Sequence, residues 1–175
     1  MLAAVGRGAV EAGLTVHLVG GAVRDLLLGR ASRDLDVAVE GPAGAVPELA
    51  GRLGARPGWR LEASPPRFGT ATLAAPGGFR VDLAATRTET YARPGALPAV
   101  AAGAGLRGDL GRRDFTIPAL AKEIGPDGSL GPLVDPLGGG RDLGRRILRL
   151  LHPGSLTDDP TRAFRAVKYA ARLGF

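Results

Sequence analysis

Two aspartates, Asp34 and Asp36, are the residues with the clearest potential for chemistry, because they stand two positions apart in an apolar segment at 34–39. This segment alternates with a period of two, as strands do, so both carboxylates should lie on one face, about 6.6 Å apart along the strand. Carboxylates grouped on one face are oxygen ligands of the kind that a divalent metal ion requires. The alternative is that both aspartates occupy a solvated strand edge.

A second signal precedes the aspartates. Gly20 and Gly21 separate the apolar run 16–19 from a segment with helical spacing that begins at residue 22. Glycines before a helix N-terminus let the backbone approach an anion, and the unpaired N–H groups there favour phosphate. Arg24, one turn into the helix, adds a positive charge. An ordinary turn would also explain the glycines, but their combination with the arginine and the two aspartates favours a site for a nucleotide and its metal.

Asp82 is a candidate third carboxylate. It lies in a strand-like segment at 79–84, which follows a similar segment at 68–73 after the sequence Ala-Pro-Gly-Gly. That sequence is typical of a hairpin loop, so the two segments should pair. Asp82 could then lie beside Asp34 and Asp36, although a single aspartate on a strand is commonly an edge residue.

Two further segments combine arginines with acids. Residues 112–114 (Arg-Arg-Asp) precede an apolar run, where Asp114 or Thr116 could cap a helix whose arginines would be solvated. Residues 157–173 predict a single helix that has acids at its N-terminal end and an apolar face containing Phe164 and Val167. Asp159 and Arg162 lie one turn apart on another face of that helix. They could face a ligand together or form a solvated ion pair.

The elements that must position these residues follow from apolar spacing and from Gly and Pro breakers. Helices are expected over 3–14, over 45–53, and from residue 22 onward, with Val23, Leu26 and Leu27 packed on one face. Strands are expected over 16–19, 34–39, 68–73, 79–84 and 145–151. Residues 87–111 show weak periodicity and many Gly, Ala and Pro, which predicts a mobile connection of the kind that often carries function.

Composition limits the class of protein. A chain of 175 residues with 45% hydrophobic residues suits one domain with a real core, and the absence of cysteine excludes disulfides and thiolate metal sites. No apolar run approaches the roughly 18 residues of a membrane span, and the N-terminus lacks a signal-peptide pattern, so a soluble cytoplasmic protein without a membrane partner is expected. A formal net charge of +6 indicates a polyanionic partner.

Four stretches together resemble the class II tRNA nucleotidyltransferases (CCA-adding enzymes) and the bacterial poly(A) polymerases. They are GGAVRDLLLGRASRDLDVAV, RRDFTIPALA, DPLGGGRDL and DDPTRAFRAVKYAARLGF, in the order that the family has them. The resemblance implies an α/β (α+β) fold: a polymerase-beta-like head over 1–151 with a mixed, mostly antiparallel sheet and flanking helices. The start of a helical neck would follow over 152–175, while the rest of the neck, the body and the tail of the family are not in this sequence.

The resemblance also implies a role for each matching residue. Asp34 and Asp36 match the pair that binds two Mg²⁺ ions, and Asp82 falls where the family has its third catalytic carboxylate. The residues at nucleotide-binding positions are Gly20, Gly21, Arg24, Arg113, Asp114, Asp159, Arg162, Arg165 and Lys168. Within that group, Asp159 and Arg162 match the pair that hydrogen-bonds the Watson–Crick edge of CTP or ATP.

The implied activity is template-independent addition of C, A or both from CTP and ATP to the 3′ end of tRNA, with release of pyrophosphate. Three alternatives remain: a poly(A) polymerase acting on other RNA, a nucleotide-binding fragment that is inactive without its body and tail, and a metal-dependent transferase acting on a sugar nucleotide. Two departures from the family pattern bear on base selection. Pro118 replaces an Asn, and Lys168 replaces an Arg, which loses bidentate phosphate geometry.

Overall fold

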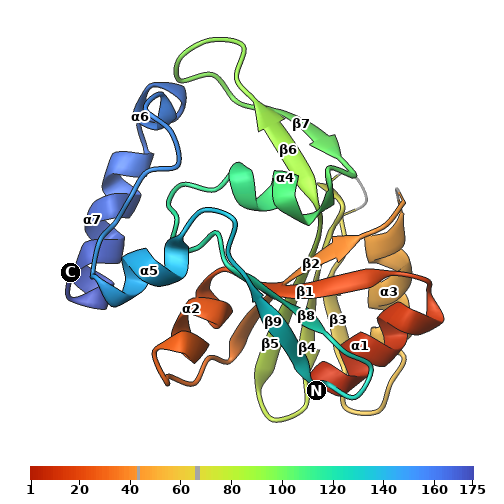
Figure 1. Cartoon of the computed structure of the whole chain (residues 1–175). Helices are drawn as coiled ribbons and strands as arrows, with labels where there is room; N and C mark the ends of the chain where they lie inside the picture. Colours follow the sequence, from red (N-terminus) through yellow and green to blue (C-terminus); the bar gives the residue numbers. More distant parts are fainter. Residues whose placement is uncertain (43, 66–67) are drawn as a thin grey trace.

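The chain folds around a seven-stranded sheet flanked by helices (Figure 1). The computed structural model describes residues 1–42, 44–65 and 68–175. The strands are β1 (Thr15–Val19), β2 (Asp34–Glu40), β3 (Arg60–Ala63), β4 (Thr70–Ala75), β5 (Phe79–Ala85), β6 (Arg87–Thr90), β7 (Ala99–Ala102), β8 (Ala121–Ile124) and β9 (Leu130–Val134). The order in the main sheet is β3–β4–β5–β2–β1–β8–β9, and β6 pairs with β7 separately.

The main sheet is mixed, because β2 and β5 pair in parallel while the other neighbouring strands pair in antiparallel. This confirms the predicted mixed, mostly antiparallel sheet. The helices are α1 (Leu2–Glu11), α2 (Gly21–Leu27), α3 (Ala45–Gly54), α4 (Gly105–Gly111), α5 (Gly139–Gly144), α6 (Ser155–Asp158) and α7 (Arg162–Leu173). In the part of the chain that the structure describes, no helix is long and apolar enough to cross a membrane.

One face of the sheet carries the main hydrophobic core, and α1 and α3 cover it (Figure 1). Alternate residues of the strands point toward these helices, among them Val37 of β2 and Leu73 of β4, which are 1% and 0% exposed. Leu49 and Leu53 of α3 are fully buried against them. The predicted helix at 45–53 is confirmed together with its packed face, because its apolar residues recur at the helical period.

The opposite face of the sheet, hereafter the site face, carries the polar residues of β2, β4 and β5. It is partly covered by α4 and by the segment at 112–120, with a small cluster of buried residues that includes Val19, Ala38 and Leu110. In the parallel ladder between β2 and β5, Asp36 lies opposite Asp82. The predicted strand pairing around the aspartates is therefore confirmed, and the topology places the carboxylates of two separate segments side by side.

The β4–β5 hairpin confirms the predicted pairing of 68–73 with 79–84, although β4 begins at Thr70. The packing predicted for α2 is wrong in part. Val23 is fully buried, but Leu26 and Leu27 are 45% and 42% exposed. A helix of seven residues presents only a narrow stripe to the sheet, and Arg24 and Asp25 share the buried side instead.

Two connections differ from the prediction. Residues 87–111 contain the β6–β7 hairpin and α4 rather than an irregular connection, because backbone pairing and packing of α4 on β6 order a sequence with little apolar periodicity. Residues 145–151 do not form the predicted strand. A single bridge joins Leu150 to Phe115, and the segment otherwise lacks regular structure.

The C-terminal helix predicted over 157–173 is broken into α6 and α7, because Asp159 adopts an extended backbone. Its orientation also differs from the prediction: Phe164 and Val167 are 80% and 71% exposed, whereas Arg162 is buried. Arg162 and Tyr169 face the segment at 112–120, where an ion pair of Arg162 with Asp114 and an aromatic contact of Tyr169 with Phe115 hold them. The predicted helix capped by Asp114 or Thr116 is wrong as well, because residues 112–120 are not helical.

Candidate active site

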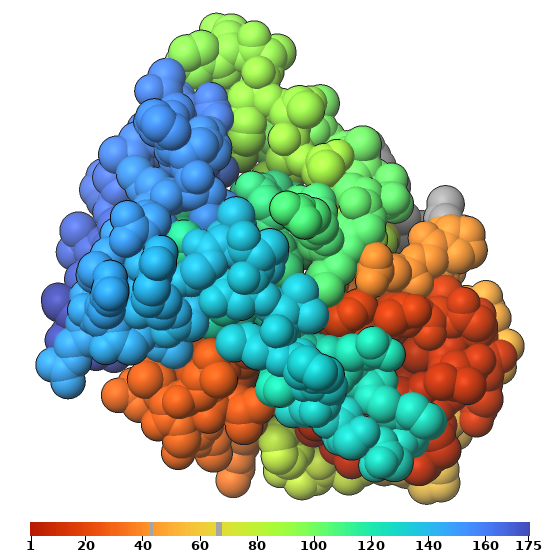
Figure 2. Space-filling model, in the orientation of Figure 1, coloured from red at the N-terminus to blue at the C-terminus, as the bar shows by residue number. Residues whose placement is uncertain are grey.

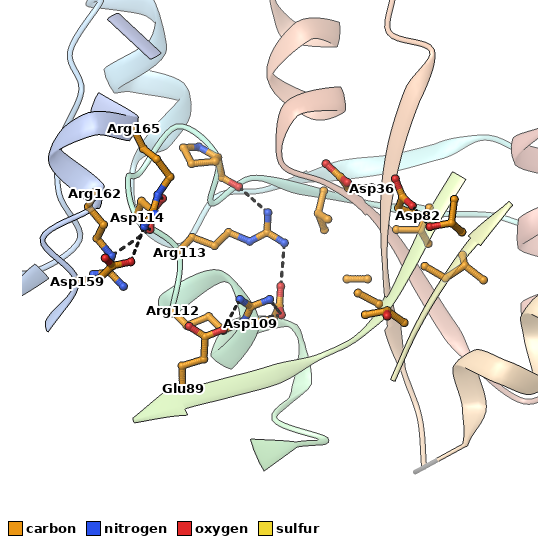
Figure 3. A pocket seen from close by; sticks show the side chains of 18 of the residues that line it. Asp36, Asp82, Glu89, Asp109, Arg112, Arg113, Asp114, Asp159, Arg162 and Arg165 are labelled. Carbon is orange, nitrogen blue, oxygen red and sulfur yellow. Dashed lines mark hydrogen bonds and ion pairs between the residues drawn. The ribbon is translucent and has the colours of Figure 1, made fainter. Parts of the chain in front are cut away.

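A cavity of about 540 Å³ lies between the site face, the 89–114 region and α7 (Figure 3). Carboxylates outnumber arginines among its lining residues. The charged residues that line it are Asp36, Asp82, Glu89, Asp109, Asp114, Asp159, Arg112, Arg113, Arg162 and Arg165. The tip of the β6–β7 hairpin meets α6, where the Gly95 N–H donates to the Asp158 carbonyl, and Figure 2 shows these segments side by side.

The carboxylates of Asp36 on β2 and Asp82 on β5 form the acidic end of the cavity, whereas Asp34 is not among the residues that line it. Asp34 and Asp36 share the site face of β2, and Asp36 and Asp82 lie opposite each other, as Figure 3 shows. Burial raises the pKa of Asp36, Arg113 partly offsets that rise, and the nearby charges of Asp82 and Asp34 add to it. The three acids therefore repel one another, and a cation would relieve that repulsion.

Asp82 already has partners. The Arg80 guanidinium contacts both of its oxygens, with Nε 2.8 Å from Oδ2 and Nη2 3.3 Å from Oδ1. The Thr72 hydroxyl also donates to Oδ1. Within residues 1–42, 44–65 and 68–175, no three acidic or histidine side chains converge closely enough to hold a metal ion as they stand. The donor set nevertheless fits Mg²⁺, since three carboxylates on adjacent strands supply the hard oxygen ligands that this ion takes.

Gly20 lies beside the acidic end of the cavity. Its backbone is left-handed (φ +66°), and a Cβ there would come within 2.9 Å of Arg113 Nη1 and 3.7 Å of Asp36 Oδ2. Gly20 therefore brings the backbone close to charged side chains, and the approach of the Gly20–Gly21 turn to a phosphate stays a prediction. Arg24, which is predicted to position the triphosphate, has a buried guanidinium that forms a bidentate pair with Asp25 and lies 5.9 Å from the Tyr169 ring centroid.

The arginine pair at 112–113 is organised by a buried acid. Asp109, whose side chain is 3% exposed, accepts from Arg113 Nη2 at 2.9 Å and from Arg112 Nη2 at 2.7 Å. Burial alone would raise the pKa of Asp109, but Arg113 and Arg112 outweigh it and lower the pKa. Arg113 Nη1 also donates to the Pro118 carbonyl at 3.1 Å. Figure 3 shows Arg113 between Asp109 and the carboxylates of the sheet.

Asp114 joins the segment at 112–120 to α7. Its Oδ1 lies 3.0 Å from Arg162 Nε, and both of its oxygens accept from Arg165. Arg162 also donates from Nη1 to the Ser155 hydroxyl at 2.9 Å, and its guanidinium carbon lies 5.8 Å from the ring centroid of Tyr91. Because these contacts hold Arg162 on several sides, its position at the cavity wall is well defined.

Asp159 and Arg162 both line the cavity, but their side chains do not pair with each other. Asp159 accepts from Thr161 and, at 2.7 Å, from Arg165. These hydrogen bonds, with the Thr161 hydroxyl contributing most, lower the pKa of Asp159 to about 2. The solvated ion pair that spacing suggested is therefore wrong. Lys168 is exposed on α7 and is not among the residues that line the cavity.

Sequence reasoning missed several residues of this site. Asp109 stands three and four positions before Arg112 and Arg113, a spacing that permits ion pairs on a helix and was an available signal. Glu89 and Tyr91 carried no such signal. Glu89 accepts from Arg112 Nη1 at 2.9 Å, and Tyr91 lies against Arg162, but both stand in the segment with weak periodicity.

A mixed sheet whose adjacent strands present acids to an arginine-lined cavity is the arrangement of a polymerase-beta-like nucleotidyltransferase head. Residues 16–149 match the poly A polymerase head domain, and the chain belongs to that family. This membership favours an RNA nucleotidyltransferase over the sugar-nucleotide transferase that was considered as an alternative.

Individual relatives sharpen the comparison. The chain is 46% identical over 176 residues to the A-adding tRNA nucleotidyltransferase of Geobacter sulfurreducens, covering 100% of this chain and 19% of that protein. It is 45% identical over 156 residues to the CC-adding tRNA nucleotidyltransferase of Deinococcus radiodurans, covering 89% and 40%.

Solved structures that resemble this chain are enzymes of the same kind as the sequence relatives. A CCA-adding enzyme in an apo form superimposes with a TM-score of 0.84 at 39% identity, covering 99% of this chain and 40% of that one. A tRNA-processing enzyme solved with CTP gives a TM-score of 0.80 at 42% identity, covering 98% and 42%. The chain thus spans between about a fifth and two fifths of the length of these proteins.

Proposed function

We propose that this chain is the catalytic head of an RNA nucleotidyltransferase that adds C, A or both to the 3′ end of tRNA. The observation that carries the proposal is the convergence, in one cavity, of carboxylates from β2 and β5 with the arginines of 112–113 and of α7. The names of the relatives, which act on tRNA with C or A, supply the substrate class.

In the proposed reaction the RNA 3′-hydroxyl oxygen attacks the α-phosphorus of CTP or ATP. A new P–O bond to the RNA forms and the hydroxyl proton passes to solvent, while the bond between the α-phosphorus and the bridging oxygen breaks and pyrophosphate leaves. Asp34 and Asp36, with Asp82, are the residues proposed to hold two Mg²⁺ ions. When bound, these ions would lower the pKa of the attacking hydroxyl and neutralise charge on the leaving group.

The protein's own residues position the nucleotide in this proposal. Gly20 and Gly21 let backbone approach the triphosphate beside Asp36, and Arg113 supplies a guanidinium that Asp109 holds in place. A positive group near a developing phosphate charge stabilises the transition state, and a prearranged group does so without reorganisation. Arg24 supports the Gly20–Gly21 turn and does not bind the phosphates itself, because its charge is already paired with Asp25. Its Nη2 atom lies 3.5 Å from the position that a Cβ of Gly21 would take.

Base selection is assigned to Asp159 and Arg162, which line the cavity opposite the sheet. When a nucleotide binds, the edge of its base would replace Thr161 and Arg165 as the hydrogen-bond partners of Asp159. A base with the wrong edge leaves buried donors or acceptors unpaired, which is the physical source of discrimination. Pro118 keeps its carbonyl as an acceptor for Arg113, so the departure from Asn at this position preserves that contact.

A second candidate function is favoured by the share of the relatives that the chain covers, which is 19% and 40% for the two relatives compared. The chain could be a nucleotide-binding head that transfers nothing without further segments. The two candidates share the cavity and differ in whether RNA reaches it. A poly(A) polymerase of the same family would differ in its RNA acceptor alone.

The deciding experiment measures Mg²⁺-dependent incorporation of labelled CTP and of ATP, separately, into three acceptors. These are a tRNA that lacks its 3′-terminal CCA, a tRNA that ends in CC, and an unrelated RNA. Incorporation that disappears in Asp34→Ala supports the transferase, and the preferred acceptor names the subtype. Binding of CTP or ATP without incorporation supports the second candidate. The absence of any nucleotide binding would contradict both.

A further inference from the structure

We propose that Arg80 is an internal counter-ion of the carboxylate group, which a divalent metal ion must displace from Asp82 before Asp34, Asp36 and Asp82 can bind it together. The inference rests on the proposed function, since it concerns the same carboxylates. It adds a residue to which the family resemblance assigns no role.

Asp82 is held by contacts within the protein. Both of its carboxylate oxygens are engaged by Arg80, at 2.8 Å and 3.3 Å, and Oδ1 also accepts from the Thr72 hydroxyl. A carboxylate whose two oxygens both contact one guanidinium directs lone pairs toward that group rather than toward Asp36. This explains why the acids do not converge as a metal-binding group although the strand register places Asp36 and Asp82 opposite each other.

Strand register carries the second step. Arg80 is the residue opposite Asp34 in the parallel β2–β5 ladder, so its positive charge lies in the same row as that acid. The same guanidinium contacts both carboxylate oxygens of Asp82. The guanidinium therefore compensates negative charge that a divalent cation would otherwise compensate.

Exposure makes the exchange feasible. The Arg80 side chain is 54% exposed, so water solvates the guanidinium as soon as it leaves Asp82. Exposed ion pairs between such groups contribute little net stability. A doubly charged ion interacts with a carboxylate more strongly than a single guanidinium does at the same distance. Arg80 is accordingly expected to weaken metal binding by a small factor and not to prevent it.

The test measures binding of Mn²⁺, as a probe for Mg²⁺, to the 175-residue chain by the electron paramagnetic resonance signal of free Mn²⁺. We expect Arg80→Gln to bind Mn²⁺ about three- to tenfold more tightly than the wild type, because a competing charge is removed. Arg52→Gln is the matched control. It removes the same charge from an exposed pair on α3, in which Arg52 Nη2 lies 3.0 Å from Glu48 Oε1, and it should change Mn²⁺ affinity less than twofold.

A second comparison tests whether Arg80 competes with Mn²⁺ for Asp82 or only changes the overall charge near the site. In an Asp82→Asn background, Arg80→Gln should no longer strengthen Mn²⁺ binding, because the pair that it breaks is already absent. Circular dichroism of each variant checks that the sheet is intact. Equal or weaker binding by Arg80→Gln would overturn the inference, since Arg80 would then either be indifferent or hold Asp82 ready for the metal.

The outcomes also distinguish this inference from the proposed function. If Asp34→Asn abolishes Mn²⁺ binding while Arg80→Gln leaves it unchanged, the carboxylate site stands and the role of Arg80 is overturned. If neither the wild type nor Arg80→Gln binds Mn²⁺ at millimolar concentrations, the role of Arg80 and the metal assignment are overturned together.

Discussion

The two faces of the seven-stranded sheet are built from the same strands but by different physics. On the face covered by α1 and α3, adjacent strands contribute apolar residues that are fully buried, such as Leu73 of β4 and Val81 of β5. On the site face, the next residues of the same strands, Thr72 and Asp82, join a network of hydrogen bonds and ion pairs. Successive residues of a strand point to opposite faces, so neighbouring positions contribute apolar packing on one face and charged contacts on the other.

The two faces of the sheet contribute differently to stability and to function. The core face gains stability from apolar burial, which is non-directional and tolerates many sequences of the right period. On the site face, burial and then the nearby charges of Asp82 and Asp34 raise the pKa of Asp36, and Arg113 comes from a distant segment to offset part of that rise. Substitutions on the site face should therefore reduce activity with little loss of stability. Substitutions on the core face should reduce stability with little loss of activity per folded molecule.

The largest effect is expected on the site face. Asp36→Asn should reduce nucleotide incorporation at least about a thousandfold, because it removes a proposed metal ligand worth several kcal/mol in the transition state. Its free energy of unfolding at neutral pH should stay the same or rise, since burial disfavours the charged form of this acid. Urea denaturation beside an incorporation assay measures both. Glu48→Gln, an exposed acid on α3, is the control and should change neither.

The converse substitution lies on the core face. Leu73→Ala should lower the free energy of unfolding by about 3 kcal/mol, because Leu73 is 0% exposed and its truncation leaves a cavity. The melting temperature should fall by roughly 6–12 °C. Leu61, the cross-strand neighbour of Leu73, is 41% exposed, and Leu61→Ala should cost less than half as much. A specific activity per folded molecule that fell as sharply as for Asp36→Asn would contradict the separation of the faces.

Thr72→Val sharpens the comparison at the position next to Leu73. It removes the hydroxyl that donates to Asp82 while it keeps the shape of the side chain, so incorporation should fall about tenfold and stability should change by less than about 1 kcal/mol. Thr72→Ser retains the donor and should restore most of the activity. If valine and serine behaved alike, the hydrogen bond to Asp82 would have no role in positioning it.

The smallest effect is expected in acid. The pKa of Asp159 is lowered to about 2, so its contribution to stability is present above the unfolded-state value of 3.8 and is lost as the pH falls from there toward 2. Asp36, whose pKa is raised, has the opposite sign: its contribution is present below the unfolded-state value and is lost as the pH rises through its folded-state value. Urea denaturation of Asp159→Asn should show a weaker pH dependence than the wild type between about pH 4 and 2.5. An unchanged slope would contradict the lowering of the pKa of Asp159 by its hydrogen bonds with Thr161 and Arg165.

Periodicity was sufficient to predict the elements of the core face. The α3 helix, the β4–β5 hairpin and the strand around Asp36 were predicted because their apolar residues recur at the helical or strand period. It failed where polar contacts outweigh apolar burial. The apolar stripe of α7, with Phe164 at 80% exposure, does not face the head, because the ion pair of Arg162 with Asp114 sets the orientation of that helix.

By itself, the sequence determined the Gly20–Gly21 turn and the placement of Asp34 and Asp36 on one face, since each depends on local propensity and spacing along one element. The fold class was predicted from the resemblance of four stretches to a known family. Only the tertiary structure decided which charges meet. The contact of Arg112 with Glu89 and the pairs of Asp114 with the arginines of α7 join segments far apart in the chain, and strand register places Asp82 opposite Asp36. Electrostatic partners are chosen by distance in space, and apolar periodicity carries no information about that distance.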